Sequence, residues 1–310
     1  MNRRQLLTAT AAIAAAAPSV LAAQTLEQYK AGATAVEGDA ILFLAQSDGS
    51  FARSGLTFDI QKLNSGEVIA AAVNAGDIDV GSMNTLSLAI AHQNGIALKI
   101  IAPGVMYDNS HTASQMMVAK TSSVTSGRDL TGKVFAINVL HGSAQLFAQS
   151  WIDKRGGDSS TVHWIELPFS LMEGALIAGR VDAALIVPPF AQKAQATCRS
   201  LGPPGDGIAP RFLNGAYVVT ETWLAAHRGA AARFNAVISK DARYYNANPS
   251  ASVQAVADLT KQDAAVITSS VRAIFGDSLD PALLQPVIDV GARYGLLKRP
   301  FPATEIIAQV

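Results

Sequence analysis

The chain has 310 residues, of which 49% are apolar and 15% are charged, a composition that excludes disordered and fibrous proteins. Its 24 basic and 24 acidic residues balance, so the sequence has no basic excess for binding nucleic acid. One cysteine excludes an internal disulfide framework and a zinc-ribbon cluster, and the length predicts about two domains.

Residues 1–23 have the pattern of a secretory signal peptide. Arg3 and Arg4 precede an apolar run, residues 6–17, that is too short to span a membrane. We expect cleavage near Ala22 or Ala23 and a periplasmic protein. The arginine pair fits either the general secretory route or the twin-arginine route. No cysteine directly follows the expected cleavage site, so no lipid anchor is predicted. No later run reaches ~18 consecutive apolar residues, so no membrane insertion is predicted.

Short apolar strands alternate with helices in the first part of the sequence. Asp39 and Ser65 stand where helices begin, and Gly76 and Gly95 stand where helices end. The predicted strands are residues 29–33, 58–60, 78–80 and 98–102, and the predicted helices are residues 39–45, 66–75 and 85–94. This alternation predicts βαβ units and largely parallel sheets.

A second series of strands and helices follows. The predicted strands are residues 116–119, 134–138, 162–166 and 181–187, and residues 143–154 are a predicted helix. Ser170 and Glu173 have the spacing of a capping box for another helix. The glycine- and proline-rich residues 202–210 predict a loop or a boundary.

The last part of the chain is mostly helical. One strand is predicted at residues 217–219, and Thr220 is placed to cap the helix that follows it. Asp280 followed by Pro281 is a typical start signal for a later helix. The predicted helices are residues 230–246, 252–260 and 281–294.

Two stretches, residues 66–81 and 174–187, have the same order of helix, glycine, aspartate and short strand. The glycine of each can take the left-handed conformation that ends a helix. A Ser-Gly-Arg-Asp-Leu-Thr-Gly-Lys-Val stretch at residues 126–134 and a Pro-Pro-Phe turn at residues 188–190 accompany them. With these motifs, the sequence resembles the nitrate/sulfonate/taurine-type solute-binding proteins of ABC importers, a group that includes pyrimidine-precursor binders.

The resemblance implies a type II periplasmic-binding-protein fold. This is an α/β fold of two lobes, each a mostly parallel sheet flanked by helices, joined by two hinge crossovers. Lobe one would be residues 24–112 plus 214–310, and lobe two residues 113–213. The implied function is to bind a small organic or oxyanion-like solute of the sulfonate, taurine, nitrate, pyrimidine or aromatic-acid class in the cleft. The receptor, a monomer, would deliver this solute to an ABC permease and its ATPase.

Ligands of open α/β sheets lie beyond the carboxyl ends of strands, where helix N-termini offer free backbone N–H groups. Five turns of this sequence fit that place, and the resemblance adds the crossovers near residues 108–111 and 214–217. The candidate ligand-binding residues are Glu37, Ser65, Gly66, Asn84, Thr85, Asn109, His141, Gly142, Ser143 and Pro189. None of the five turns contains Lys or Arg, which favours a neutral, singly charged or heteroaromatic solute over phosphate or sulfate.

Several of these candidates, and Phe190 beside them, have a structural alternative. Ser65 and Thr85 fit helix caps as well as ligand contacts. Glu37 fits a solvated loop residue as well as a partner for a cationic or hydrogen-donating group. His141 fits either a ligand contact or a structural residue at a helix start. Phe190 fits core packing better than stacking on a ligand.

Enzyme motifs are missing from the sequence. It contains no G-x-S-x-G, H-E-x-x-H or P-loop motif, and its histidines lack metal-ligand spacing, so no catalytic residue, metal or cofactor is predicted. The alternative is a cleft enzyme of the same fold, desulfinase-like or pyrimidine-synthase-like, that uses His141 or Cys198. A cysteine expected for a desulfinase in the first turn is replaced by Thr34, Ala35 and Val36. A further alternative is a protein that presents its ligand to a membrane sensor.

Overall fold

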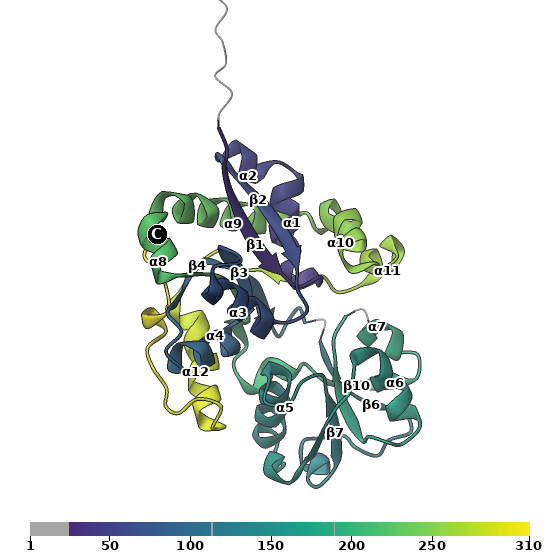
Figure 1. Ribbon diagram of the computed structural model, residues 1–310. Helices are drawn as coiled ribbons and strands as arrows, with labels where there is room; N and C mark the ends of the chain where they lie inside the picture. Colours follow the sequence, from purple (N-terminus) through teal and green to yellow (C-terminus); the bar gives the residue numbers. More distant parts are fainter. Residues whose placement is uncertain (1–24, 113, 189) are drawn as a thin grey trace, which may run out of the picture.

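The computed structural model describes residues 25–112, 114–188 and 190–310 (Figure 1). The predicted signal peptide therefore lies outside the described residues. The described chain forms two five-stranded sheets and one three-stranded sheet. Within these ranges, no helix combines the length and the apolar character needed to cross a membrane.

The first sheet takes strands from both ends of the described chain. In spatial order its strands are β2 (Leu56–Lys62), β1 (Glu27–Ala33), β3 (Val80–Asn84), β12 (Gly215–Thr220) and β4 (Leu98–Pro103). β1 pairs in parallel with β2 and β3, whereas β12 is antiparallel to both β3 and β4. Within this sheet, β12 alone runs against the other strands.

The second sheet repeats this plan with the middle of the chain. In spatial order its strands are β8 (His163–Glu166), β7 (Val134–Ile137), β9 (Ala183–Ile186), β6 (Gln115–Ala119) and β10 (Cys198–Gly202). β7 pairs in parallel with β8 and β9, whereas β6 is antiparallel to β9 and β10. Both sheets therefore have the same strand order. When the four parallel strands of each sheet are numbered along the chain, their spatial order is second, first, third and fourth, and the reversed strand lies between the third and the fourth. The predicted α/β class with mostly parallel sheets is confirmed, with one reversed strand in each sheet.

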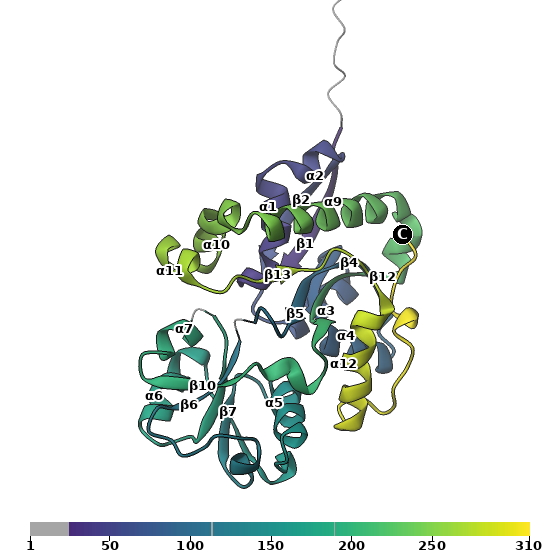
Figure 2. The same ribbon diagram turned by 180° about the vertical axis from the view of Figure 1, so that it is seen from behind.

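Two crossovers join the sheets. β5 (Val105–Asp108) leads from the first sheet to the second, and β11 (Arg211–Leu213) leads back. Both belong to the three-stranded sheet, which β13 (Ile274–Phe275) completes in the order β11-β5-β13. Figure 2 shows β5 and β13 where the two halves of the molecule meet. We name these halves lobe one and lobe two with the division at residues 112 and 213 predicted above, and those bounds stay a prediction.

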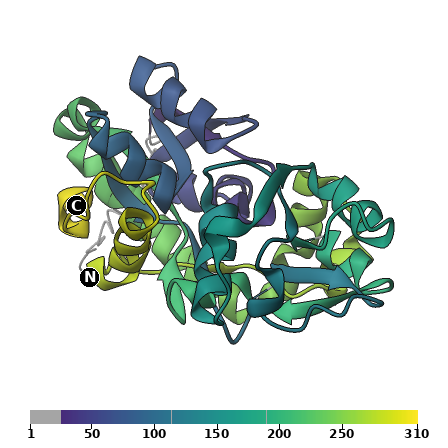
Figure 3. The ribbon, with the colours of Figure 1, turned by 90° about the horizontal axis from the view of Figure 1, so that it is seen from below.

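Helices cover both faces of each sheet. Lobe one carries α1 (Ala40–Ser47), α2 (Ser50–Arg53), α3 (Gly66–Ala75), α4 (Thr85–Gln93), α8 (Glu221–Ala226), α9 (Arg228–Ala247), α10 (Val253–Thr260), α11 (Ala264–Ser269) and α12 (Pro281–Arg293). Lobe two carries α5 (Ser143–Lys154), α6 (Phe169–Ile177) and α7 (Phe190–Ala194). Seen from below, the teal elements of lobe two lie to one side of the molecule and the yellow C-terminal segment lies to the other (Figure 3).

Local capping explains where several predicted helices begin and end. The side chains of Ser65, Thr220 and Asp280 each accept a hydrogen bond from a backbone N–H of the first turn, at 3.4, 3.1 and 2.9 Å. Each cap satisfies a donor that the helix itself leaves unpaired. Gly76 after α3 and Gly179 after α6 have φ angles of 80° and 65°, a left-handed conformation that glycine adopts without strain.

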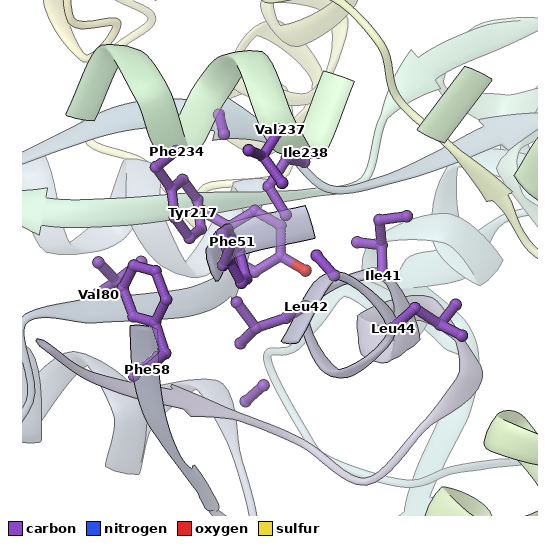
Figure 4. Packing of buried hydrophobic residues seen from close by; sticks show 14 of the residues in the cluster. Ile41, Leu42, Leu44, Phe51, Phe58, Val80, Tyr217, Phe234, Val237 and Ile238 are labelled. Atoms are coloured by element: carbon purple, nitrogen blue, oxygen red, sulfur yellow. The ribbon is translucent and has the colours of Figure 1, made fainter. Parts of the chain in front are cut away.

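Aromatic side chains fill the core on one face of the first sheet (Figure 4). Phe51 and Phe234 stack with ring centroids 5.4 Å apart, and Tyr217 meets Phe234 edge-on at 5.4 Å. All three are buried, which holds α2 and α9 on this face. On the opposite face, Ile69 and Ile288 belong to a separate buried cluster under α3 and α12. The sheet of lobe one is therefore covered on both sides, as a mostly parallel sheet requires.

Several predicted elements differ from the structure. The capping box is wrong, because α6 begins at Phe169 after Pro168 and so Ser170 is its second residue. β3 begins at Val80, later than predicted. The short crossover strands β5 and β11 were not predicted, and neither was β10, which runs into the loop predicted at residues 202–210. These strands have few residues and lack the alternation that identifies a half-buried strand.

Candidate ligand-binding site

A cavity of about 320 Å³ lies where lobe one, lobe two and the crossovers meet. It stands beyond the carboxyl ends of β1 and β9, the place where open α/β sheets bind ligands. Its volume is in the range of small-molecule sites. The polar residues on its wall are Glu37, Asp108, His111, Thr112, Ser114, Asn214 and Arg272.

The crossovers build an aromatic wall for this cavity. Tyr107 stacks on Phe212 with ring centroids 4.7 Å apart, and Phe147 meets Phe212 edge-on at 5.4 Å. Phe212 is buried behind them, while Tyr107 and Phe147 line the cavity together with Val105 and Val187. The fixed rings give an apolar surface for the body of an organic ligand.

Glu37 and Arg272 form an ion pair on the cavity wall. Arg272 Nε donates to Glu37 Oε1 at 2.6 Å, and the two side chains are only 11% and 13% exposed. The guanidinium also donates to Pro249 O at 2.8 Å and to Ser252 Oγ at 2.9 Å. Ala273 N donates to the same Glu37 oxygen at 3.2 Å. Because both charges are largely withdrawn from water, these added hydrogen bonds offset part of the desolvation cost.

Asp39 fixes the turn that carries Glu37. The sequence predicts Asp39 as a helix cap, but its side chain makes no capping hydrogen bond with α1. One carboxylate oxygen instead accepts hydrogen bonds from the backbone N–H of Thr34, at 2.9 Å, and from its hydroxyl, and the other accepts from Ser82 Oγ at 2.5 Å. Burial raises the pKa of Asp39 above its ordinary value, although these hydrogen bonds oppose the rise. The carboxyl therefore ties the middle of β3 to the turn after β1.

The candidates at the starts of α3 and α4 lie close together but do not line the cavity. A Cβ atom on Gly66 would lie 3.6 Å from Asn84 Nδ2, so the two turns are neighbours. Ser65 caps α3, and Asn84 caps α4 by accepting a hydrogen bond from Ser87 N at 2.8 Å. Thr85 is buried and donates to Leu213 O at 2.6 Å. Capping and packing account for these three side chains without a ligand.

The candidates of lobe two lie at the start of α5. His141 is exposed and has a φ angle of 60°, a left-handed conformation that is uncommon for a bulky residue. Its backbone N–H donates to Gln145 Oε1 at 2.7 Å. Gly142 is the cap residue and Ser143 the first residue of α5. None of these three candidates is among the described residues of the cavity wall.

The remaining candidates lie apart from the cavity or outside the described chain. Asn109 is exposed and borders a separate hollow of about 290 Å³ with Lys154 and Asp206. Pro189 lies outside the described residues. Phe190 packs against Phe169, with ring centroids 6.4 Å apart, as the packing interpretation expects.

The cysteine has the environment of a buried hydrophobe. Cys198 is 1% exposed in a cluster with Met172 and Ala194, and it does not line the cavity. Burial raises the pKa of its thiol, which disfavours the thiolate that a nucleophile needs. Among the described residues, no group of three or more His, Cys, Asp or Glu side chains is arranged to hold a metal ion.

Arg272 lines the cavity but is absent from the candidates predicted from the sequence. It stands between α11 and β13, 235 positions from Glu37, and no local motif marks it. The absence of Lys and Arg from the five predicted turns is correct, yet the fold brings a guanidinium to one of them.

The family model described as NMT1/THI5 like matches residues 39–252, more than half of the chain. The chain belongs to this NMT1/THI5-like family. The resemblance inferred from the repeated motifs is thereby confirmed. The match begins at Asp39 and covers both crossovers and all of lobe two, whereas Glu37 and Arg272 lie outside it.

Relatives of this NMT1/THI5-like chain include a taurine-binding periplasmic protein of Escherichia coli (strain K12). It is 29% identical over 150 residues, which cover 47% of this chain and 44% of that protein, so the match spans less than half of its length. Among solved structures, the fold is similar to the periplasmic aliphatic sulphonate binding protein SsuA from Escherichia coli, with a TM-score of 0.75, 18% identity and coverage of 91% of this chain and 92% of that one. It is also similar to the periplasmic nitrate-binding protein NrtA from Synechocystis PCC 6803, with a TM-score of 0.73, 14% identity and coverage of 91% and 85%. All three are named as binding proteins, and the two structures show the fold.

Proposed function

We propose that this chain is a periplasmic receptor that binds one small organic or oxyanion-like solute between its lobes and delivers it to an ABC permease with its ATPase. The observation that carries the proposal is the cavity of about 320 Å³ whose wall combines residues of both lobes and both crossovers. A solute held there touches both halves of the molecule and so favours any arrangement in which they lie closer together. The names of the relatives support the same role.

The proposal assigns recognition to the cavity wall. Glu37 supplies a carboxylate, Arg272 holds it, and Tyr107 and Phe147 supply the apolar surface. Contacts that form when the lobes approach are proposed for the candidates at the helix starts, namely Ser65, Gly66, Asn84, Thr85, His141, Gly142 and Ser143. Export by the predicted signal peptide and a monomeric state belong to the same proposal.

Thermal unfolding of residues 24–310 against a solute panel tests the proposal. The panel contains nitrate, alkanesulfonates, taurine, pyrimidines, aromatic carboxylates and amines. A solute at ~100 times its dissociation constant stabilises the folded state by ~2.7 kcal/mol, which raises the melting temperature by a few degrees at this size. We expect shifts confined to one chemical class. A flat panel, with no small molecule released from the denatured protein, would contradict a receptor function.

A further inference from the structure

One oxygen of the Glu37 carboxylate is left open at the cavity. Oε1 accepts hydrogen bonds from Arg272 Nε and Ala273 N, at 2.6 and 3.2 Å. Oε2 accepts none from any residue that the structure describes, and the Glu37 side chain keeps 13% of its surface exposed on the cavity wall. An ionised carboxylate oxygen can only accept hydrogen bonds. Oε2 is therefore free to accept a hydrogen bond from a ligand.

Arg272 is a less suitable site for an anion. Three of its five N–H donors already have acceptors, namely Glu37 Oε1, Pro249 O and Ser252 Oγ. Its positive charge is balanced by Glu37 at 2.6 Å. An anion at Arg272 would have to compete with a carboxylate that is fixed in place by the fold.

The other charged residues of the cavity do not add a free cation. Asp108 lines the wall as a second carboxylate, and its Oδ1 accepts from Ser110 N and Oγ at 3.0 and 2.5 Å. Its Oδ2 lies 3.8 Å from Arg211, which is outside the wall and 57% exposed. The described wall thus carries two carboxylates, one guanidinium and the imidazole of His111, a set that suits a ligand with a donor or a positive group better than a multiply charged anion.

We infer that the solute presents an N–H donor, an amine or ammonium group, to Glu37 Oε2. Its apolar body lies against Val105, Tyr107 and Phe147, and Arg272 is a positioning residue that orients Glu37 through the other oxygen. The inference rests on the receptor role proposed above and names the class of its solute. A site built around an acceptor discriminates against an analogue without the donor, because the acceptor then stays unpaired in the complex.

Calorimetric titration with matched probe pairs tests this inference. One pair is taurine and ethanesulfonate, and the other is benzylamine and benzyl alcohol. The variants are Glu37→Gln, whose amide oxygen can still accept from Arg272 while its amide nitrogen replaces Oε2, and the control Glu221→Gln. Glu221 is an exposed carboxylate that pairs with Lys99 at 3.0 Å and is absent from the cavity wall. Melting temperatures of both variants verify that they fold.

The wild-type protein is expected to bind the amine of at least one pair about tenfold or more tightly than its partner. Glu37→Gln loses this preference and Glu221→Gln keeps it. Equal binding of the two members in every pair that the wild-type protein binds, or a preference that survives Glu37→Gln, overturns the inference and leaves the receptor role intact. The inference is also overturned, with the receptor role intact, if mass spectrometry identifies a copurified solute that lacks N–H groups. No binding of any probe and no released solute would contradict the receptor role and the inference with it.

Discussion

The two lobes share a scaffold and differ at the turn that meets the cavity. In lobe one, Asp79 Oδ2 accepts from Lys30 N at 2.8 Å, and Asp79 N donates to Lys30 O at 2.9 Å. In lobe two, Asp182 makes the same exchange with Val134, at 2.9 Å for both hydrogen bonds. The aspartates of the two repeated stretches therefore join the approach to the third strand to the first strand of each sheet. The shared motif therefore has a structural role in each sheet.

The turns after the first strands differ. In lobe one, Asp39 is half-buried among donors and Glu37 pairs with Arg272. In lobe two, His141 is exposed and its backbone is held by Gln145. Lobe one thus supplies the charged groups of the cavity, and lobe two supplies part of its apolar wall. The common strand order sets where the cavity lies, and the residues that are not repeated set what it can bind.

The largest expected effect comes from breaking the core of lobe one. Phe234→Ala removes a ring that is 1% exposed and stacks on Phe51 at 5.4 Å. The free energy of unfolding should fall by about 3–5 kcal/mol, the usual cost of deleting a buried aromatic side chain. Urea denaturation measures this loss. Tyr244→Ala on the same helix is the control, since Tyr244 is 54% exposed and its loss should cost far less. Equal losses would contradict the packing described for α9.

Removal of the shared aspartates tests whether the two scaffolds are equivalent. Asp79→Ala and Asp182→Ala each leave one backbone N–H of the first strand without its carboxylate acceptor. Each should lower the free energy of unfolding by about 1–3 kcal/mol, the range for hydrogen bonds to charged groups and for unsatisfied donors. Both variants are compared with the wild-type protein in one denaturant series. A loss confined to one lobe would show that the motif serves different purposes in the two halves.

Arg272→Lys sharpens the contrast between the two turns. A lysine keeps the charge but cannot hold Glu37, Pro249 and Ser252 with one planar group. We expect about tenfold weaker solute binding, equivalent to about 1.4 kcal/mol. Titration calorimetry with the strongest solute of the panel measures it. Arg211→Lys on the exposed crossover is the control and should leave the affinity unchanged. Equal affinities for all three proteins would remove Arg272 from the recognition wall.

Asp39 should give the smallest effect, visible as a dependence on pH. Burial raises its pKa in the folded protein, so the protonated form is favoured by folding. The corresponding stability is present below the ordinary pKa of aspartate and is lost as the pH rises through the raised value. Tyr217 nearby stays neutral in this range, because burial and the charge of Asp39 raise its pKa well above the ordinary value.

Melting curves of wild-type protein and Asp39→Asn between pH 3 and pH 8 test this sign. Relative to wild-type protein, Asp39→Asn should gain stability as the pH rises through the raised pKa of Asp39. If the wild-type protein instead gains stability relative to Asp39→Asn as the pH rises, the hydrogen bonds to the carboxylate outweigh its desolvation.

The sequence predicts those parts of the fold that depend on neighbouring residues. Ser65, Thr220 and Asp280 cap the helices expected of them because a cap acts on its own first turn. Asp39 has the same local signal, but its carboxylate accepts from Thr34 in the same turn and from Ser82 on another strand, so the capping prediction is wrong. Arg272 has no local signal at all, since only the folded chain brings it to Glu37.

The candidate site could likewise be predicted only where it depends on local sequence. The expectation that ligands lie beyond the carboxyl ends of the strands led to the turn of Glu37, because strand order fixes that edge of the sheet. It could not distinguish Glu37 from Thr85, whose hydroxyl finds an acceptor 128 positions away in the chain. Which side chain faces the cavity depends on long-range packing that spacing does not encode.

The most direct measurement is calorimetric titration of residues 24–310 with the panel solutes, followed by mass spectrometry of the recovered solute. We expect one solute to bind per chain, with saturation, and to be chemically unchanged after incubation. Conversion of the solute to a product by the pure protein would contradict a receptor function, since a transport receptor releases what it binds.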